Sequence, residues 1–213
     1  MFEIKTVTVE RKSRESIIRT SIAGGKPAAD LKEKINTSIH FLNHMIEQWA
    51  WRSCLNLSAD VQLTHFVLQH VIAEDAGLCF GEALLRSAMQ LMKYQGINGS
   101  GAAEGFIDEA AARVRISFEF RSGLYCNKGN VIVPERVEDM LCTDLWNFLG
   151  GLAQGARATL HVDLLSGEDP HHIWESVFRG LGEATRAAFS PCLWRKGQTP
   201  GVAGMIEVNV EES

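Results

Sequence analysis

The chain of 213 residues lacks any run of about eighteen apolar residues, so we expect no membrane-spanning helix. It also lacks an excess of basic residues, because 21 Lys and Arg stand against 26 Asp and Glu, a formal net charge of −5. Proteins that rely on phosphate attraction to bind nucleic acid usually carry the opposite balance, so we expect no nucleic-acid partner. Residues 1–14 carry charges of both signs where a secretory signal peptide would need an apolar core.

Cysteine and proline are scarce, with five of each. The cysteines never form a C-x-x-C pair, which favours reduced thiols and a cytoplasmic location, or an organelle if a presequence has been removed. A hydrophobic content of 46% excludes a disordered or fibrous chain. The length is typical of one structural unit.

Hydrophobic periodicity in the first half predicts strand, strand, helix, strand, helix. Apolar and polar residues alternate over 2–11 and 16–22, which indicates a β-hairpin. Apolar residues then recur at helical spacing over 39–49, alternate again over 55–63, and return to helical spacing over 69–92.

The second half repeats this order. Alternation over 112–120 and an extended stretch at 131–133 predict two strands. A helix over 145–152, a strand over 158–164 and a helix over 173–188 follow.

A local match supports duplication, because QHVIAE at 69–74 and PHHIWE at 170–175 superpose with a constant offset of 101. We therefore predict an α+β fold made of two repeats, about 1–95 and 105–195, with helices packed between two sheets. No linker separates the repeats, so residues 1–213 form a single unit with a C-terminal tail.

The histidines provide the clearest functional signal. His171 and His172 precede Glu175 by four and three residues, so one helix face can present two imidazoles and a carboxylate to a cation. His70 and Glu74 repeat the four-residue spacing in the first half. Nitrogen and oxygen donors of this kind suit Mn, Fe, Zn or Co.

His44 on the earlier helix and His161 on a strand are further candidate ligands, whereas His40 and His65 lie outside the pattern. One His–Glu pair alone is more often a surface interaction than a ligand set. Its repetition in a duplicated chain favours a metal site.

At these residues the chain resembles the imidazoleglycerol-phosphate dehydratase family of histidine biosynthesis. The resemblance spans nearly the whole sequence, through RKSRES at 11–16, FLNHM at 41–45, FIDEA at 106–110, ATLHV at 158–162 and HHIWE at 171–175. It implies a fold like that of ribosomal protein S5 domain 2. It also implies a lyase that removes water from imidazole glycerol phosphate to give imidazole acetol phosphate.

The resemblance implies two Mn²⁺ sites, with ligands drawn from neighbouring subunits of a 24-subunit shell built from trimers. The implied ligands in this chain are His44, His70, Glu74, His161, His171, His172 and Glu175. The implied catalytic carboxylates are Glu15 and Glu74, and the substrate contacts fall on Gln48, Arg121 and Arg179. Considered alone, Glu15 would be a surface charge of the hairpin and Gln48 an exposed helix amide. Each arginine alone would more often be solvated or salt-bridged than a phosphate ligand.

Several positions depart from the family pattern. Val71 replaces the second imidazole of the first His-His-x-x-Glu motif, so the second Mn²⁺ site is expected to be weakened. Carboxylates near the ligands are replaced at Asn43, Leu68 and Gln69. The phosphate cradle loses an Arg at Gly99 and a Lys at Ala203, and Arg195 and Lys196 are alternative cations for it.

Three functions remain open at this point. The first is a dehydratase with one full and one weakened metal site. The second is a catalytically impaired relative with a structural or regulatory role in an oligomer, either alone or with an active paralogue. The third is another metal-assisted reaction on a different small molecule.

Overall fold

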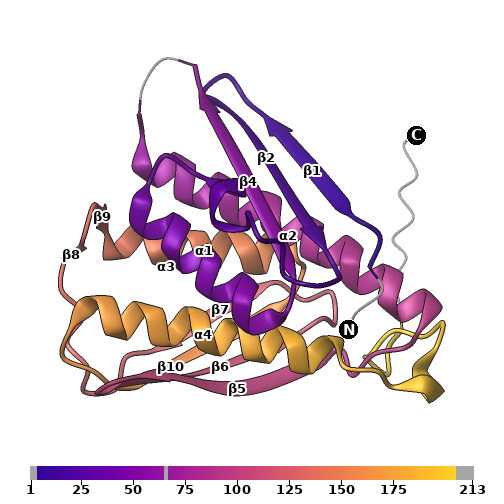
Figure 1. Cartoon of the computed structure of the whole chain (residues 1–213). Coiled ribbons are helices and arrows are strands. Elements are labelled where there is room, and N and C mark those ends of the chain that lie inside the picture. Colours follow the sequence, from indigo (N-terminus) through magenta and orange to yellow (C-terminus); the bar gives the residue numbers. More distant parts are fainter. Residues whose placement is uncertain (1–3, 65–66, 205–213) are drawn as a thin grey trace, which may run out of the picture.

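The computed structural model describes residues 4–64 and 67–204, in which four α-helices lie between two four-stranded sheets (Figure 1). The helices are α1 (His40–Ser53), α2 (Gln69–Tyr94), α3 (Cys142–Gly155) and α4 (Pro170–Phe189). The strands are β1 (Val7–Lys12), β2 (Ser16–Ala23), β3 (Ile35–Asn36), β4 (Asn56–Leu63), β5 (Ser100–Ile107), β6 (Ala110–Ser117), β7 (Gly123–Asn127), β8 (Arg136–Val137), β9 (Met140–Leu141) and β10 (Thr159–Ser166). Two 3₁₀ turns cover Lys32–Lys34 and Leu193–Arg195.

The two large sheets have the same topology. The first has the order β1-β2-β4-β3 and the second β5-β6-β10-β7. In each, three strands run antiparallel, and the fourth pairs parallel with the last strand of its half. The prediction of a duplicated α+β fold is therefore confirmed.

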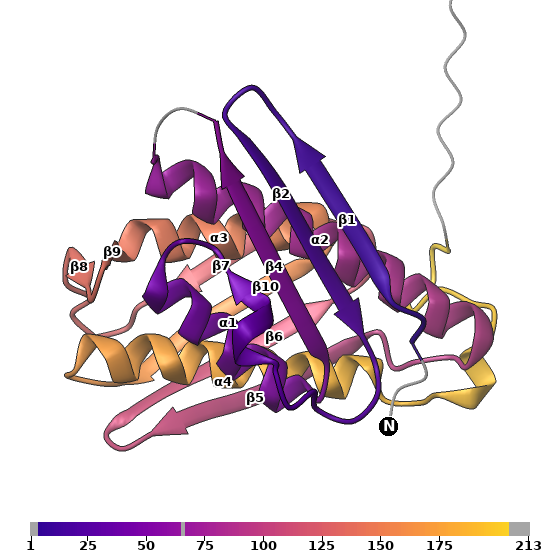
Figure 2. The same ribbon diagram turned by 45° about the horizontal axis from the view of Figure 1, so that its top comes forward.

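The helices bury their apolar faces against the sheets and against each other. Helix α2 lies against β1 and β2, and α4 lies against β5 and β6 (Figure 2). Between the sheets, α1 packs on α4 and α2 packs on α3. Within the described ranges, no helix is long and apolar enough to cross a membrane.

Burial patterns define which positions of the two halves are equivalent. Buried positions 41, 42, 45, 46, 49 and 50 of α1 recur in α3 at 144, 145, 148, 149, 152 and 153, a constant difference of 103. Strands β4 and β10 have the same offset, since they begin at 56 and 159. His44 on α1 is thus equivalent to Asn147 on α3.

The strand predictions for the second half are partly wrong. The expected long strand over 112–120 is the shorter β6, and no strand forms at 131–133. The alternation misses β5, because its inward positions Gly101, Ala103 and Gly105 carry no large apolar side chain. A Cβ atom at Gly105 would lie 2.0 Å from the Ser176 carbonyl oxygen, so α4 approaches this strand backbone to backbone.

Glycines also allow α2 and α3 to approach closely. A Cβ atom at Gly77 would lie 2.2 Å from the Phe148 carbonyl oxygen, and one at Gly151 would lie 2.4 Å from that of Glu74. Both distances are shorter than those at which Cβ atoms contact other heavy atoms in proteins, so neither position accepts a side chain unless a helix moves. The adjacent Gly150 is different, because its nearest neighbour would be Leu124 at 3.9 Å.

We predict that Gly151→Ala lowers the free energy of unfolding by about 1–3 kcal/mol, because it forces α2 away from α3. Gly150→Ala, the matched control, should raise it by about 0.5–1 kcal/mol through helix propensity. Urea unfolding of both variants measures the difference. Equal effects at the two positions would contradict the close helix contact.

Candidate metal and substrate site

The start of α4 places two of the predicted metal ligands. Asp169 caps this helix by accepting a hydrogen bond from the His171 N–H at 2.7 Å, and Pro170 occupies the first turn. Ile173 and Val177 are buried in the core and fix the helix rotation. As a result, His171 and Glu175 lie one turn apart on the face towards α1.

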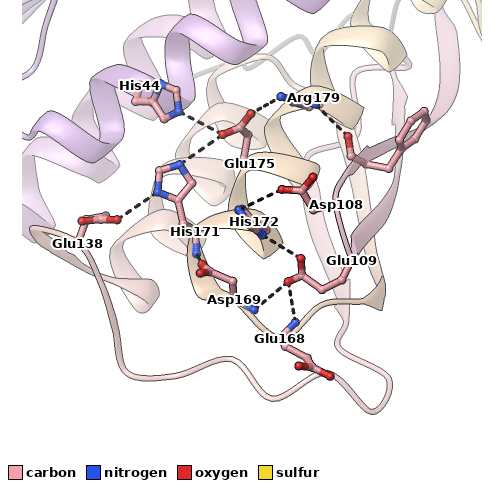
Figure 3. Close-up of polar contacts among 11 residues, drawn as sticks. His44, Asp108, Glu109, Glu138, Glu168, Asp169, His171, His172, Glu175 and Arg179 are labelled. Carbon is pink, nitrogen blue, oxygen red and sulfur yellow. Dashed lines mark hydrogen bonds and ion pairs between the residues drawn. The ribbon is translucent and has the colours of Figure 1, made fainter.

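His44 on α1 meets these two residues across the helix pair, as Figure 3 shows. The Nε2 atoms of His44 and His171 lie 3.2 and 3.3 Å from the same oxygen, Oε2 of Glu175. One ligand atom from each residue lies within 4.8 Å of the other two. In the described part of the chain, this is the one group of three or more potential ligands that could hold a single cation.

The Glu175 carboxylate is buried, at 4% relative exposure. Burial would raise its pKa, but the hydrogen bond with His44 and the charge and hydrogen bond of Arg179 outweigh burial and lower the pKa below its ordinary value. Arg179, one turn further along α4, holds the second oxygen, Oε1. The side chain is therefore a fixed anion at the centre of the cluster.

The turn between β8 and β9 orients the same cluster. Glu138 accepts a hydrogen bond at 3.1 Å from the Nδ1 atom of His171, which leaves the opposite ring nitrogen, Nε2, directed at Glu175 (Figure 3). Asp139 accepts hydrogen bonds from the backbone N–H groups of His40 and Phe41 at the start of α1. One short turn thus positions both helices that carry the ligands.

His172 points away from this cluster. Its Nδ1 lies 2.9 Å from Glu109 and its Nε2 lies 3.5 Å from Asp108, both on the β5–β6 turn. The hydrogen bond with Glu109 raises the pKa of His172. The pKa of Glu109 falls to about 2, chiefly because it accepts a backbone hydrogen bond from Asp169 and a side-chain hydrogen bond from His172.

The α2–α3 helix pair holds a second, different cluster. His70 lies 3.4 Å from Glu74, and its Nδ1 atom lies 2.9 Å from the side-chain amide nitrogen of Asn147 and 3.8 Å from the carboxylate of Asp144. Asn147 occupies the place that His44 has in the other half. The duplicated fold therefore has two equivalent helix seams, and the α2–α3 seam has an amide where the α1–α4 seam has an imidazole.

His161 is not brought to either cluster. It lies on β10 between the buried residues Leu160 and Val162, so it faces the outer side of the second sheet. There it stacks on Tyr125, with ring centroids 4.9 Å apart.

The other predicted residues lie at separate places. Glu15 is exposed in the β1–β2 turn. Gln48 is half-buried one turn after His44 on α1, and Arg121 is exposed between β6 and β7. His40, a predicted non-ligand, contributes a backbone N–H to the Asp139 contact, and His65 and Phe2 lie outside the described residues.

Two arginines line a cavity of about 240 Å³ beyond Glu175, where α1, α4 and β5 meet. They are Arg179 of α4 and Arg52 of α1, with Glu183, Glu104 and Phe106 also in the lining. Arg179 donates to the Phe106 carbonyl oxygen at 3.1 Å, and Arg52 lies 3.9 Å from Glu183. His44, Gln48 and Arg52 are spaced four residues apart, so one face of α1 leads from the cluster to the cavity.

Two of the departures from the family pattern have acquired structural contacts. The Asn43 side-chain oxygen accepts hydrogen bonds from the Thr37 N–H and hydroxyl at 2.8 and 2.6 Å. Gln69 donates to the Asp139 carbonyl oxygen at 2.9 Å.

The remaining departures from the family pattern differ in exposure and packing. Val71 is half-buried, Leu68 is partly exposed before α2, and Ala203 is exposed. Gly99 packs against Pro200, whose Cγ atom lies 1.9 Å from where a Cβ atom would be, so no arginine fits there without movement. Arg195 donates to the adjacent Asn98 carbonyl oxygen.

Sequence comparison places this arrangement in a known group. Residues 37–185 match the profile of imidazoleglycerol-phosphate dehydratase. The chain is 33% identical over 207 residues to the imidazoleglycerol-phosphate dehydratase of Methylococcus capsulatus, covering 95% of this chain and 98% of that one. The chain belongs to the imidazoleglycerol-phosphate dehydratase family. The enzyme of that name from Azotobacter vinelandii is 31% identical, with 95% and 98% covered.

Solved structures of dehydratases agree with the fold. The crystal structure of the Pyrococcus furiosus enzyme in complex with (S)-C348 aligns with a TM-score of 0.74 at 29% identity, covering 92% of this chain and 99% of that one. The Staphylococcus aureus enzyme aligns with a TM-score of 0.71 at 25% identity, covering 88% and 100%. The resemblance of the sequence to this dehydratase family is thus confirmed.

Sequence reasoning assigned no role to Glu138, Asp139, Glu109 or Arg52. Glu109 lies within the FIDEA segment that carries the resemblance, so its position offered a signal. Glu138 and Asp139 reach residues about 33 and 99 positions away, and periodicity reports no contact at such separations.

We predict that Glu109→Gln lowers the pKa of His172 in the metal-free protein, because it removes the hydrogen-bonded carboxylate that favours the protonated ring. Titration followed by NMR of the imidazole protons measures this change. Glu104→Gln is the matched control, since that carboxylate pairs with Arg113 on the exposed sheet face. An unchanged His172 titration in Glu109→Gln would show that the pair does not form in solution.

Proposed function

We propose that this chain removes water from imidazole glycerol phosphate to give imidazole acetol phosphate, the reaction for which its relatives are named. The observation that carries the proposal is the single seam between α1 and α4, where the His44–His171–Glu175 cluster lies next to a cavity lined by two arginines. Such a seam offers nitrogen and carboxylate ligands at one end and cations for a phosphate at the other.

The residues present fit a divalent cation. Two imidazole nitrogens and one buried carboxylate oxygen form a donor set that Mn²⁺, Fe²⁺, Zn²⁺ or Co²⁺ accepts. A cation bound there would stabilise negative charge on the substrate's imidazole ring as a proton leaves carbon. Of these ions we favour Mn²⁺, on the strength of the family resemblance.

Arg179 and Arg52 are suited to the phosphate group. Guanidinium groups bind phosphate oxygens with paired hydrogen bonds and keep their charge at neutral pH. Gln48 lies between His44 and Arg52 along α1, where its amide can contact the middle of a bound substrate. Arg121 lies between β6 and β7 and does not line this cavity, so its proposed phosphate contact would be made with the substrate of a neighbouring subunit.

Glu15 is the proposed general base. An exposed carboxylate in a turn can reach a substrate outside its own surface, and its oxygen would take the proton from carbon. Glu74, next to His70, is the second proposed carboxylate. Proton transfer by a placed side chain contributes typically about 10²–10⁴-fold to the rate.

We also propose that copies of this chain assemble. Within one chain, the His44–His171–Glu175 cluster is not joined by the other proposed ligands and base, His70, His161, His172 and Glu15. The family resemblance implies that ligands are shared between neighbouring subunits in trimers and larger shells. In such an assembly these side chains complete sites with residues of other copies.

A second candidate function has its own support. In the cluster at His70, Val71 stands where the family resemblance implies a second imidazole. Asn147, which contacts His70, stands where the other helix pair has His44. A relative with one damaged site could serve as a structural or regulatory subunit without turnover. Activity and metal content distinguish the two candidates.

We predict that the purified protein supplied with Mn²⁺ releases imidazole acetol phosphate from imidazole glycerol phosphate. Glu15→Gln should lower kcat by about 100-fold or more, while Glu82→Gln, which breaks an exposed pair with Arg86 on α2, should retain the wild-type rate. Absence of turnover at every Mn²⁺ concentration in folded wild-type protein would instead support the structural role.

Metal content tests the asymmetry of the two clusters. We expect Glu175→Gln to weaken Mn²⁺ affinity by at least roughly 10–100-fold. Val71→His should add metal to each subunit. Calorimetric titration of both variants against Glu82→Gln measures these changes. Unaltered affinity in Glu175→Gln would exclude the His44–His171–Glu175 cluster as the metal site.

A further inference from the structure

The β1–β2 turn that carries Glu15 is closed by its own side chains. Ser13 Oγ accepts hydrogen bonds from the N–H groups of Glu15 and Ser16, both at 3.1 Å. The Ser13 N–H in turn donates to the Ser16 carbonyl oxygen at 2.9 Å. The backbone on either side of Glu15 is therefore fixed locally.

The end of β4 holds the same turn from a second direction. Thr64 donates from its N–H and its hydroxyl to the Glu15 carbonyl oxygen, at 3.0 and 2.9 Å. The hydroxyl also lies 2.8 Å from the Arg14 carbonyl oxygen. Together these contacts hold the peptide units before and after Glu15.

A buried carboxylate on α2 supplies the third attachment. Asp75 forms an ion pair at 2.9 Å with Arg11 and accepts a hydrogen bond at 3.4 Å from the Ser16 hydroxyl. Its side chain is only 10% exposed. Arg11 and Ser16 stand on the two strands that flank the turn, so one carboxylate holds both sides.

The cost of burying this charge argues for a role beyond stability. The Arg11 side chain is 41% exposed, and an ion pair with one partly exposed member contributes little net stability. The pair does, however, fix position, because breaking it leaves a charge without a partner. Asp75 directly follows Glu74 on α2, so it links the turn that bears one proposed catalytic carboxylate to the helix that bears the other.

We propose that Asp75 is a positioning residue that sets the place of Glu15 through Arg11 and Ser16. This inference rests on the proposed function of Glu15 as the general base. The Glu15 side chain is exposed, so the turn backbone is what fixes the point from which its carboxylate extends. A displacement of about 1 Å can reduce a rate by about 100-fold.

Asp75→Asn tests the proposal, since it keeps the shape but removes the charge. We expect kcat to fall by about tenfold or more with KM nearly unchanged, because none of the arginines proposed to hold the phosphate lies in the β1–β2 turn. In a Glu15→Gln background the same substitution should cause no further loss. Glu82→Gln, which breaks an exposed pair with Arg86 on the same helix, should change neither constant.

Amide hydrogen exchange provides a second readout that does not require activity. Asp75→Asn should accelerate exchange at Glu15 and Ser16, and Glu82→Gln should not. Ser16→Ala, a milder change, should give a smaller acceleration and serves if Asp75→Asn does not fold.

Two results would overturn the proposal. One is unchanged exchange at the turn, and the other is an equal loss of kcat from Asp75→Asn with and without Glu15. A wild-type protein without turnover would refute the proposed function instead, and exchange alone would then decide whether Asp75 holds the turn.

Discussion

The site depends on one buried carboxylate. Glu175 lies in a helix–helix seam that would expel a lone charge, and it remains there because His44, His171 and Arg179 surround its two oxygens. These contacts hold α1 and α4 in register and keep the pKa of Glu175 below its ordinary value. The same atoms that stabilise the anion are those that a cation would use, so the fold preorganises the ligand set.

Duplication gave the chain two copies of this seam, and the copies have diverged. The α1–α4 copy retains two imidazoles around its glutamate. The α2–α3 copy has Asn147 opposite His70 and brings the buried Asp144 to within 3.8 Å of that ring. In that pair the helices approach through Gly77 and Gly151, so backbone packing preserves the architecture while the polar residues change. The two helix pairs thus share one architecture and differ in the polar residues that they present.

Periodicity predicted the elements whose buried faces carry large side chains. Helix α4 and strand β10 are examples, because their apolar residues recur at the spacing of their structure. Strand β5 was missed because glycine and alanine face α4, and close packing there leaves no hydrophobic signal. The i, i+4 spacing of His171 and Glu175 placed both on one helix face, but it could not show that His172 turns towards Glu109.

Contacts between distant segments of the chain could not be predicted, because periodicity reports only local structure. Glu138 and Arg52 reach the seam through tertiary packing, and neither belongs to a local pattern. Asp75 is a further example, because strands β3 and β4 and helix α1 lie in the sequence between it and its partners Arg11 and Ser16.

The central claim is that Glu175 and its two histidines bind a cation. Anomalous diffraction from crystals grown with Mn²⁺ tests it most directly, because the signal locates the ion itself. The account predicts an anomalous peak within coordination distance of the Glu175, His44 and His171 side chains. A peak only beside His70 and Glu74, or none at the α1–α4 seam, would contradict it.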